Sequence, residues 1–422
     1  MLVFVWLNWL KRILPIILVV QLLLACHTNT EVADNRHQTK SNLSGTIVFW
    51  QSFPQSYFTK SLISQYNEVF AEYIKKFTEL YPRVKIVTEY ITDDEIIEKL
   101  ERETEKGLGP DLIYTQSIHI LPLIKVKALL PINKNSLNLN QFRSEALDQV
   151  LYQDTLYGVP LDLITQVLCY NKNKVEELPK TLSELISQAR KGYSVGMLSG
   201  FENTFWGTQI FGGQLLDARG RVILDRGGGW ARWMEWLKDA KKEPNFILNK
   251  DSLVLQNAFI EEQLAYIVCW SSQIPVLRES LGVNKFGVTL LPEEENQQAA
   301  PPLIVDSLLF GSNSSMTQTQ IALRFTQFLA NTPQQTESAV NLRSIIPANK
   351  YAVIDPRLFP IQAILQKQSQ KVTAFSLDET KKINATVDYG GDLYTRVMAG
   401  EISATQAANQ LSKTINSQFE EP

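Results

Sequence analysis

The chain has 422 residues, of which 44% are hydrophobic, and its formal net charge is only −3. This length predicts two or three domains, and a near-neutral chain without a basic, aromatic-interleaved patch gives no reason to expect a nucleic-acid partner. Three cysteines are too few for the disulfide framework of a small secreted domain.

The N-terminus has the features of a secretory targeting signal. Lys11 and Arg12 precede an apolar run over 13–25, which is shorter than the roughly 20 residues that a membrane-spanning helix needs and has the size of a signal-peptide core. The run ends in Leu-Leu-Ala-Cys at Cys26, which resembles the bacterial lipobox. The alternative is an uncleaved anchor helix over 2–24, which would place two cations in hydrocarbon at high cost.

The lipobox resemblance implies that residues 1–25 are removed as a signal peptide. It also implies that Cys26 carries a lipid such as palmitate, which would anchor the protein to a membrane. The segment 26–44 is polar and has no periodic apolar residues. We therefore expect it to be a flexible tether between the lipid and the folded body.

The first folded half alternates the patterns of strands and helices. Apolar, β-rich runs over 46–50, 84–87 and 111–114 predict three buried strands. Helical spacing of apolar residues over 70–80 and a cap at Asp93 predict two intervening helices. A βαβαβ order predicts a mostly parallel sheet. Ligands of such sheets lie beyond the carboxyl ends of the strands, so the candidate ligand contacts are Trp50, Gln51, Ser52, Gln116 and Ser117; core packing is an equal alternative for Trp50.

One central stretch, residues 158–172, is expected to link two similar α/β halves. It begins with Gly-x-Pro, continues as an apolar, β-branched run and ends in Tyr-Asn-Lys, which is the pattern of a buried strand leaving a turn. We expect this stretch to pass beside the ligand, which makes Asp162 a further candidate contact.

Four motifs, in this order and spacing, resemble one known family. They are Phe-x-x-x-Tyr-Pro-x-Val-Lys-Ile (77–86), Gly-Leu-Gly-Pro-Asp-Leu-Ile (107–113), Tyr-Gly-Val-Pro (157–160) and Tyr-Asn-Lys (170–172). Each is weak alone, but together they make the chain similar to the extracellular solute-binding proteins of sugar-importing ABC transporters, a family typified by maltose-binding protein. The resemblance implies an α/β, periplasmic-binding-protein-like fold of two lobes, with a multi-strand hinge and a ligand cleft between them.

The resemblance also implies how the chain divides between the lobes. The N-terminal lobe is expected to comprise residues 45–161 and 303–344, and the C-terminal lobe residues 162–302 and 345–422. In this division, a predicted strand at 303–310 returns the chain to the first lobe. Ile345-Ile346-Pro347 then returns it to the second.

The second half supplies aromatic candidates for the ligand site. Trp206 lies in a glycine-rich aromatic segment, and an aromatic ring can cover the C–H face of a sugar at little entropic cost; a packed loop is the alternative. An apolar run over 264–270 predicts a buried strand that ends in the candidates Trp270 and Ser271, with core packing as the alternative for Trp270. Tyr389, just before the closing segment 394–409, is the last candidate.

Other patterns in this half are structural. Thr181 and Glu184 have the spacing of a helix capping box. The stripe of Trp230, Trp233, Met234 and Leu237 is typical of the buried face of a helix. Cys169 and Cys269 lie in apolar strands, where a free buried thiol is the default expectation and a disulfide is the alternative in an oxidising compartment.

The family resemblance implies the substrate-binding component of an ABC importer. Such a protein captures a mono- or oligosaccharide or related polyol between its lobes and delivers it to the membrane permease subunits. It would be a monomer, lipid-anchored at the periplasmic face of a bacterial membrane, and would not be an enzyme; no catalytic residue, metal or cofactor is expected. Ligand between the lobes would favour a closed arrangement over an open one.

Two other functions stay open at this point. A lipid-anchored extracellular glycosidase would need two suitably placed carboxylates, and only Asp111 and Asp162 have suggestive positions near strand ends. A ligand-sensing module for a membrane receptor would use the same fold, so the sequence alone does not separate it from a transport component.

Overall fold

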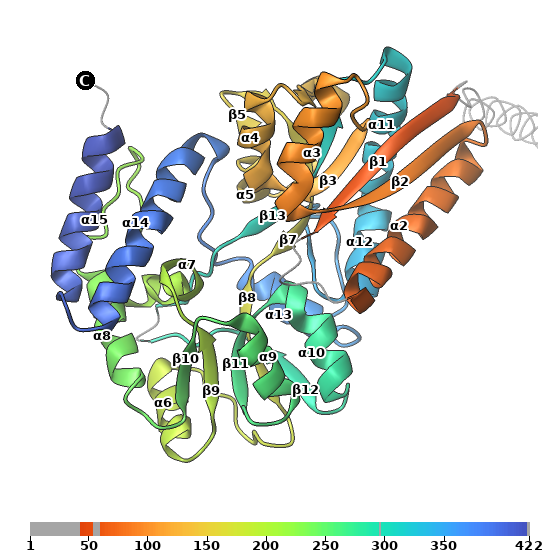
Figure 1. The fold of residues 1–422 in the computed structure, drawn as a ribbon. Helices are drawn as coiled ribbons and strands as arrows, with labels where there is room; N and C mark the ends of the chain where they lie inside the picture. Colours follow the sequence, from red (N-terminus) through yellow and green to blue (C-terminus); the bar gives the residue numbers. More distant parts are fainter. Residues whose placement is uncertain (1–42, 54–59, 295–296, 420–422) are drawn as a thin grey trace, which may run out of the picture.

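The computed structural model describes residues 43–53, 60–294 and 297–419. The predicted signal peptide, Cys26 and most of the tether lie outside these residues. Within them, two β-sheets with their helices form two lobes (Figure 1). No helix in the described ranges combines the length and the apolar character needed to cross a bilayer.

The first lobe contains a seven-stranded sheet in the order β14-β7-β13-β3-β1-β2, with β4 also paired to β13. Its strands are β1 (Gly45–Phe53), β2 (Val84–Thr92), β3 (Leu112–Gln116), β4 (Leu129–Leu130), β7 (Gly158–Ile164), β13 (Ile304–Gly311) and β14 (Ile346–Pro347). A small hairpin, β5 (Leu151–Tyr152) and β6 (Thr155–Leu156), lies beside it. The helices of this lobe are α2 (Lys60–Leu80), α3 (Asp93–Glu105), α4 (Ile120–Lys125), α5 (Ser144–Leu147), α11 (Met316–Leu329) and α12 (Thr332–Leu342).

The second lobe contains a five-stranded sheet in the order β10-β9-β11-β8-β12. Its strands are β8 (Gln166–Asn171), β9 (Val195–Leu198), β10 (Phe246–Asn249), β11 (Tyr266–Trp270) and β12 (Phe286–Thr289). Its helices are α6 (Leu182–Arg190), α7 (Phe201–Thr204), α8 (Gly229–Ala240), α9 (Ser252–Ile260), α10 (Ile274–Leu281), α14 (Thr380–Met398) and α15 (Ala404–Phe419). Helix α13 (Pro360–Gln368) contacts both β12 and β14 and so touches both lobes.

The predicted βαβαβ unit is confirmed. Strand β1 pairs in parallel with β2 on one side and with β3 on the other, and α2 and α3 connect the three strands. Strand β1 continues to Phe53, past the end of the predicted run. The predicted cap was wrong by one residue: Thr92 is the N-cap of α3, and Asp93 lies in its first turn.

Residues 158–171 form two strands, β7 in the first sheet and β8 in the second, with Thr165 between them. The Gly-x-Pro motif lies inside β7 rather than in a turn. Gly158 packs tightly there, because a Cβ would come within 2.7 Å of Leu309. The register against β13 shifts between Asp306 and Ser307, opposite Asp162 and Pro160, and such irregularities accommodate proline, which has no N–H to donate.

The chain crosses between the lobes differently from the predicted division. Strand β7 remains in the first sheet up to Ile164, past the expected boundary at residue 161. Residues 346–347, expected in the second lobe, form β14 and pair with Leu163 and Asp162 of β7 in the first sheet. The pairing of such a short strand depends on partners far away in the sequence, which the division implied by the family resemblance did not specify.

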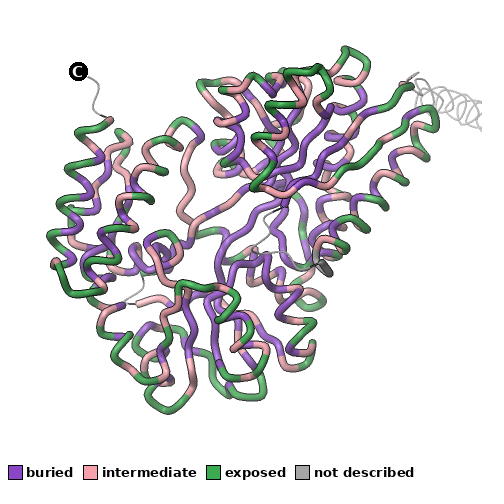
Figure 2. Tube along the Cα trace, viewed as in Figure 1, coloured by how far each residue is buried: buried purple, intermediate pink, exposed green. Residues whose placement is uncertain are grey.

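Two hydrophobic cores stabilise this arrangement. On β8, Val167 and Cys169 belong to the larger core, which continues into the first lobe, whereas Leu168 belongs to a core beneath α8, α14 and α15. This alternation is the two-residue period of a strand buried on both faces. Figure 2 shows buried residues along both sheets and the segments that join them. The predicted stripe of α8 is confirmed, because Trp230, Trp233, Met234 and Leu237 are all buried.

Two further expectations from the sequence can be compared with the structure. Thr181 and Glu184 form the predicted capping box of α6. The default expectation of free thiols was wrong, because Cys169 on β8 and Cys269 on β11 form a disulfide with a Cα–Cα distance of 6.0 Å. The two strands are antiparallel neighbours, a relation that the sequence patterns did not reveal.

Candidate functional site

A cavity of about 450 Å³ lies between the lobes, here called the interlobe cavity. One wall is the 3-10 turn Ser117–His119 at the carboxyl end of β3, together with Gln149. The opposite wall consists of α7 and the first half of α14, and the crossing segments 302–304 and 373–377 complete it. The cavity therefore lies where the sheet topology predicts a ligand, beyond the carboxyl end of a parallel strand.

Hydrogen bonds fix the polar groups on the first-lobe wall. The Ser117 hydroxyl donates to Oε1 of Gln149 at 2.9 Å, and Nε2 of Gln149 donates to the carbonyl of Leu303 at 3.1 Å. Leu303 itself donates its N–H to the carbonyl of Thr373. This wall is thus bonded to both crossing segments, and its polar atoms are held in place before any ligand arrives.

His119 is an uncharged polar group of this wall. It is almost fully buried, and its Nδ1 lies 2.7 Å from the hydroxyl oxygen of Thr115. Burial lowers the pKa of His119 to about 4, because the surroundings disfavour the charged imidazolium. At neutral pH the ring is therefore a hydrogen-bonding group without a positive charge.

The second-lobe wall is largely apolar and aromatic. The rings of Phe201 and Phe205 pack 5.4 Å apart, and Phe201 also contacts Trp230 at 5.5 Å. Phe375, from the crossing segment, is only half-buried. Aromatic walls with a few fixed polar groups are typical of sites that hold small ligands, and such rings suit the C–H faces of sugars.

The charged side chains that line the cavity are both acidic. They are Glu202 on α7 and Asp388 on α14, and the described lining contains no Lys or Arg. Glu202 is exposed to solvent, yet desolvation by the surrounding wall raises the pKa of its carboxyl above its ordinary value. A carboxylate without a cationic neighbour accepts hydrogen bonds from hydroxyl groups and repels anions.

Among the sequence-predicted candidates, Ser117 lines the interlobe cavity. Gln116 directly precedes it, is half-buried and lies opposite Asp306 in the sheet. Trp50, Gln51 and Ser52 are buried at the carboxyl end of β1 and do not line the cavity. Lys99 lies 5.0 Å from the ring of Trp50, and the Ser52 hydroxyl donates to the carboxylate of Asp93.

The predicted residues of the second lobe are mainly buried in this structure. Trp206 is 0% exposed and packs 4.9 Å from Trp233, which Gly207 permits because a Cβ there would overlap the Trp233 ring. Trp270 and Ser271 are buried where β11 meets the crossing, and Ser271 donates its N–H to the carbonyl of Thr165 at 2.8 Å. Tyr389 is half-buried against the second core, next to the cavity residue Asp388.

Asp162 forms a buried carboxylate pair with Asp306, its partner across β7 and β13. The Tyr114 hydroxyl lies 2.7 Å from Oδ2 of Asp162 and 3.3 Å from Oδ2 of Asp306. Burial raises the pKa of Asp162 to about 7 and raises that of Asp306 as well, the latter also because of the neighbouring Asp162. The pair lies within the sheet rather than in the cavity wall.

Asp111, the other carboxylate considered for a glycosidase, has a structural role. Its Oδ2 accepts from the backbone N–H of Val48 at 2.8 Å, and its Oδ1 accepts from the hydroxyl of Ser314 at 2.7 Å. It also accepts from Gln318 in the first turn of α11. Asp111 thus joins β1 to the start of α11.

Sequence patterns missed most of the cavity lining. Gln149, Phe201, Glu202, Phe375 and Asp388 come from four separate segments, and none lies in a motif that marks a binding site. The one available signal was the end of β3, which predicted Ser117. Following that rule two residues further would have reached His119.

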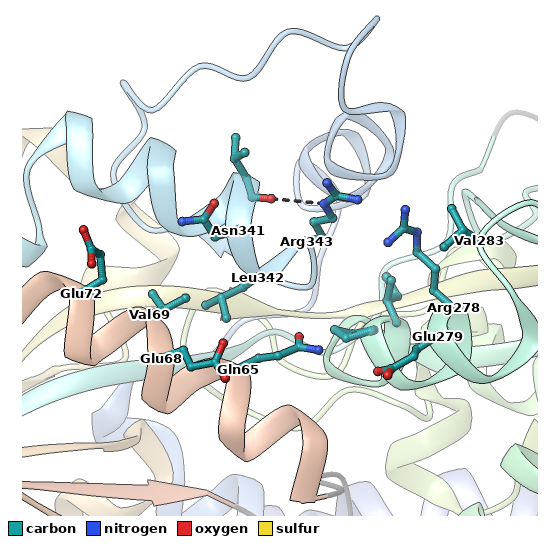
Figure 3. Close-up of a pocket in the computed structure, with 13 residues that line it drawn as sticks. Gln65, Glu68, Val69, Glu72, Arg278, Glu279, Val283, Asn341, Leu342 and Arg343 are labelled. Atoms are coloured by element: carbon teal, nitrogen blue, oxygen red, sulfur yellow. Dashed lines mark hydrogen bonds between the residues drawn. The ribbon is translucent and has the colours of Figure 1, made fainter.

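A second hollow of about 590 Å³ lies between α2, α10 and the end of α12 (Figure 3). Its lining has no aromatic side chain among the described residues, and five of its members are charged: Glu68, Glu72, Arg278, Glu279 and Arg343. Without a ring to cover a sugar face, this hollow suits a carbohydrate less well than the interlobe cavity. Neither hollow holds a candidate metal site, because the described chain has no cluster of three or more His, Cys, Asp or Glu side chains able to bind one.

Comparison with known proteins gives consistent matches. Residues 72–358 match the family described as "Bacterial extracellular solute-binding protein". The galactooligosaccharide-binding protein of Bacillus subtilis (strain 168) is 22% identical over 400 residues, covering 90% of this chain and 91% of that protein. The maltodextrin-binding protein MdxE of the same organism is 25% identical over 240 residues, covering 50% of this chain and 55% of that protein.

Solved structures share the fold. The GacH receptor of Streptomyces glaucescens GLA.O matches with a TM-score of 0.74 at 18% identity, covering 90% of this chain and 100% of that one. The MalE domain of Bdellovibrio bacteriovorus, solved with maltotriose, matches with a TM-score of 0.70 at 19% identity, covering 89% and 100%. These matches confirm the predicted two-lobed, periplasmic-binding-protein-like α/β fold.

Proposed function

This chain belongs to the family of bacterial extracellular solute-binding proteins, and we propose that it captures an uncharged carbohydrate in its interlobe cavity for an ABC importer. The observation that carries the proposal is the lining of the cavity. Three phenylalanine rings, Phe201, Phe205 and Phe375, lie near fixed hydroxyl and amide groups, and no described lining residue is cationic. The names of the matched relatives, which bind galactooligosaccharides and maltodextrins, support an oligosaccharide as the ligand class.

Capture would need binding only, without covalent chemistry. The aromatic wall covers the apolar ring face, while Ser117, Gln149 and the acidic groups bond the hydroxyls. Because the two walls belong to different lobes, a ligand that contacts both stabilises the closed arrangement over the open one. The permease subunits of the importer would then recognise the closed form. The comparisons match binding proteins and give no support to a glycosidase.

Phe375→Ala should weaken oligosaccharide binding about tenfold, because truncating a ring that stacks on a sugar removes roughly 1–2 kcal/mol. Phe375 is half-buried and lies in a loop, so the variant should fold normally. Isothermal titration calorimetry with malto- and galacto-oligosaccharides measures the change. Phe328→Ala, at a half-buried ring on α11 away from the cavity, is the matched control and should keep wild-type affinity. Equal losses in both variants would contradict the role given to Phe375.

We also propose that Cys26 is the lipid attachment site that holds the protein at the periplasmic face of a bacterial membrane. The lipobox before Cys26 supports this, as does membership of an extracellular family. Cys26→Ser should abolish incorporation of labelled palmitate and release the protein from the membrane fraction. A Cys26→Ser protein that still carries the label would show that the lipid, if any, is attached elsewhere.

A further inference from the structure

We propose that the hollow between α2, α10 and α12 is a binding site for an oxyanion, held by Arg278 and Arg343. Arg278 lies on α10 of the second lobe, and Arg343 follows α12 and precedes β14 of the first lobe. Figure 3 shows their guanidinium groups on the same side of the hollow, whereas the carboxylates of Glu68 and Glu279 lie on the other side. We call this place the two-arginine groove.

The two positive charges have no acidic partner in the described chain. Neither arginine takes part in any ion pair among the described residues. Arg343 donates one long hydrogen bond, from Nε to the carbonyl of Val340 at 3.4 Å. Burial, followed by the charge of Arg343, lowers the pKa of Arg278. Both arginines line the same hollow, so their like charges repel each other there.

The chemistry of the groove fits an anion with two or more oxygen atoms. Each guanidinium presents a planar fork of N–H donors that matches phosphate or carboxylate oxygens. The apolar side chains of Val69, Ile274 and Leu342 line the same hollow, in which Arg278 is half-buried and Arg343 is exposed. An oxyanion bound between the two guanidinium groups would attract both of them and so offset their mutual repulsion.

The backbone at Arg343 decides which substitution tests its side chain best. Arg343 ends α12 with a φ of 56°, the left-handed conformation that usually selects glycine at a helix end. A non-glycine residue in this conformation is strained. Glycine suits this conformation, so Arg343→Gly is a variant that removes the side chain without straining the backbone.

An anion that contacts both arginines would bridge the lobes, because α10 belongs to one and α12 to the other. It would favour one spacing of these helices and so couple to the arrangement of the lobes around the interlobe cavity. Binding of the anion itself does not depend on the carbohydrate proposal. The two proposals can therefore fail separately.

The test is binding of inorganic phosphate, and in a second arm succinate, to the full-length protein at constant ionic strength set with chloride. Thermal shift and calorimetry should show saturable binding in the wild type. Arg278→Gln and Arg343→Gln should each weaken it about tenfold or more, the cost of losing a charge-assisted contact. Comparison of the two arms shows whether the groove prefers a phosphate or a carboxylate group.

Arg324→Gln, at an exposed arginine on α11, is the matched control and should bind like the wild type. Arg343→Gly removes the side chain while suiting the left-handed backbone, so its loss of binding could not be attributed to misfolding. The proposal is overturned if neither anion binds saturably. It is also overturned if Arg324→Gln weakens binding as much as the groove variants do.

Discussion

Asp162→Asn should make the folded protein more stable than the wild type at about pH 8. The variant should also lose less stability than the wild type as the pH rises from about 4 to about 7. Asp162 is buried beside Asp306, and its pKa is raised from 3.8 to about 7. Asparagine is neutral throughout and keeps an oxygen to accept the Tyr114 hydroxyl. The variant therefore removes the burial of a charge without removing the hydrogen bond.

The direction of this effect follows from proton linkage. Between the pKa of Asp162 in the unfolded chain and its raised pKa in the folded protein, the folded state holds a proton that the unfolded state releases. The contribution of Asp162 to folding stability is therefore fully present below about pH 4 and is lost as the pH rises through about 7. A pKa raised by about three units corresponds to roughly 4 kcal/mol. Urea unfolding of the wild type and the variant at a series of pH values measures this difference in stability. An Asp162→Asn protein that is less stable than the wild type at about pH 8 would contradict the buried-charge account.

The titration of His119 changes the folding stability in the opposite direction, so the experiment must separate the contribution of His119 from that of Asp162. Its pKa is lowered from 6.5 to about 4, so its contribution is present above pH 6.5 and is lost as the pH falls through about 4. The two groups partly cancel in the acid range. Measuring Asp162→Asn in both the wild-type and the His119→Gln background isolates the carboxylate, and we expect the same gain at about pH 8 in both.

Removing the Cys169–Cys269 disulfide should lower the free energy of unfolding by about 2–5 kcal/mol. The bond closes a sequence separation of 100 residues, and it joins β8, which begins just after Thr165, to β11, which ends just before Ser271. Losing the bond frees the unfolded chain and also loosens the strands that support the crossing between lobes. The double variant Cys169→Ala with Cys269→Ala shows this in chemical unfolding.

Two controls accompany the double variant. Wild-type protein treated with a thiol reductant should unfold like the double variant, whereas Cys26→Ser should unfold like the oxidised wild type, because Cys26 precedes the described fold. Identical unfolding curves for the oxidised wild type and the double variant would show that the bond adds no stability.

The fold could be predicted from sequence where the signals are local. The βαβαβ unit, the capping box at Thr181 and the stripe of α8 depend on spacings within a few turns or strands, and all three formed as expected. The disulfide and the placement of β14 depend on which strands become neighbours. That information is non-local, and both expectations failed.

The candidate site shows the same limit in chemical terms. The position of Ser117 on the cavity wall could be predicted because one topological rule places ligands at the ends of parallel strands. Trp206 was a candidate because aromatic side chains often stack on sugars. In the structure, Gly207 lets Trp233 pack against Trp206, and the Trp206 ring is fully buried. Phe375 and Asp388 reach the cavity from a crossing loop and a late helix. Phe375 and Asp388 line the cavity only because of the way the two lobes pack together, and the sequence patterns did not predict that packing.

The most direct test of the central claim is a calorimetric titration of the purified protein with paired ligands. One is a neutral malto- or galacto-oligosaccharide, and the other is a uronic acid oligosaccharide of equal length. Because the described cavity lining carries carboxylates and no cation, the neutral ligand should bind saturably and be recovered unaltered, and the uronate should bind at least about tenfold more weakly. Tighter binding of the uronate, or hydrolysis of the neutral ligand, would contradict the account.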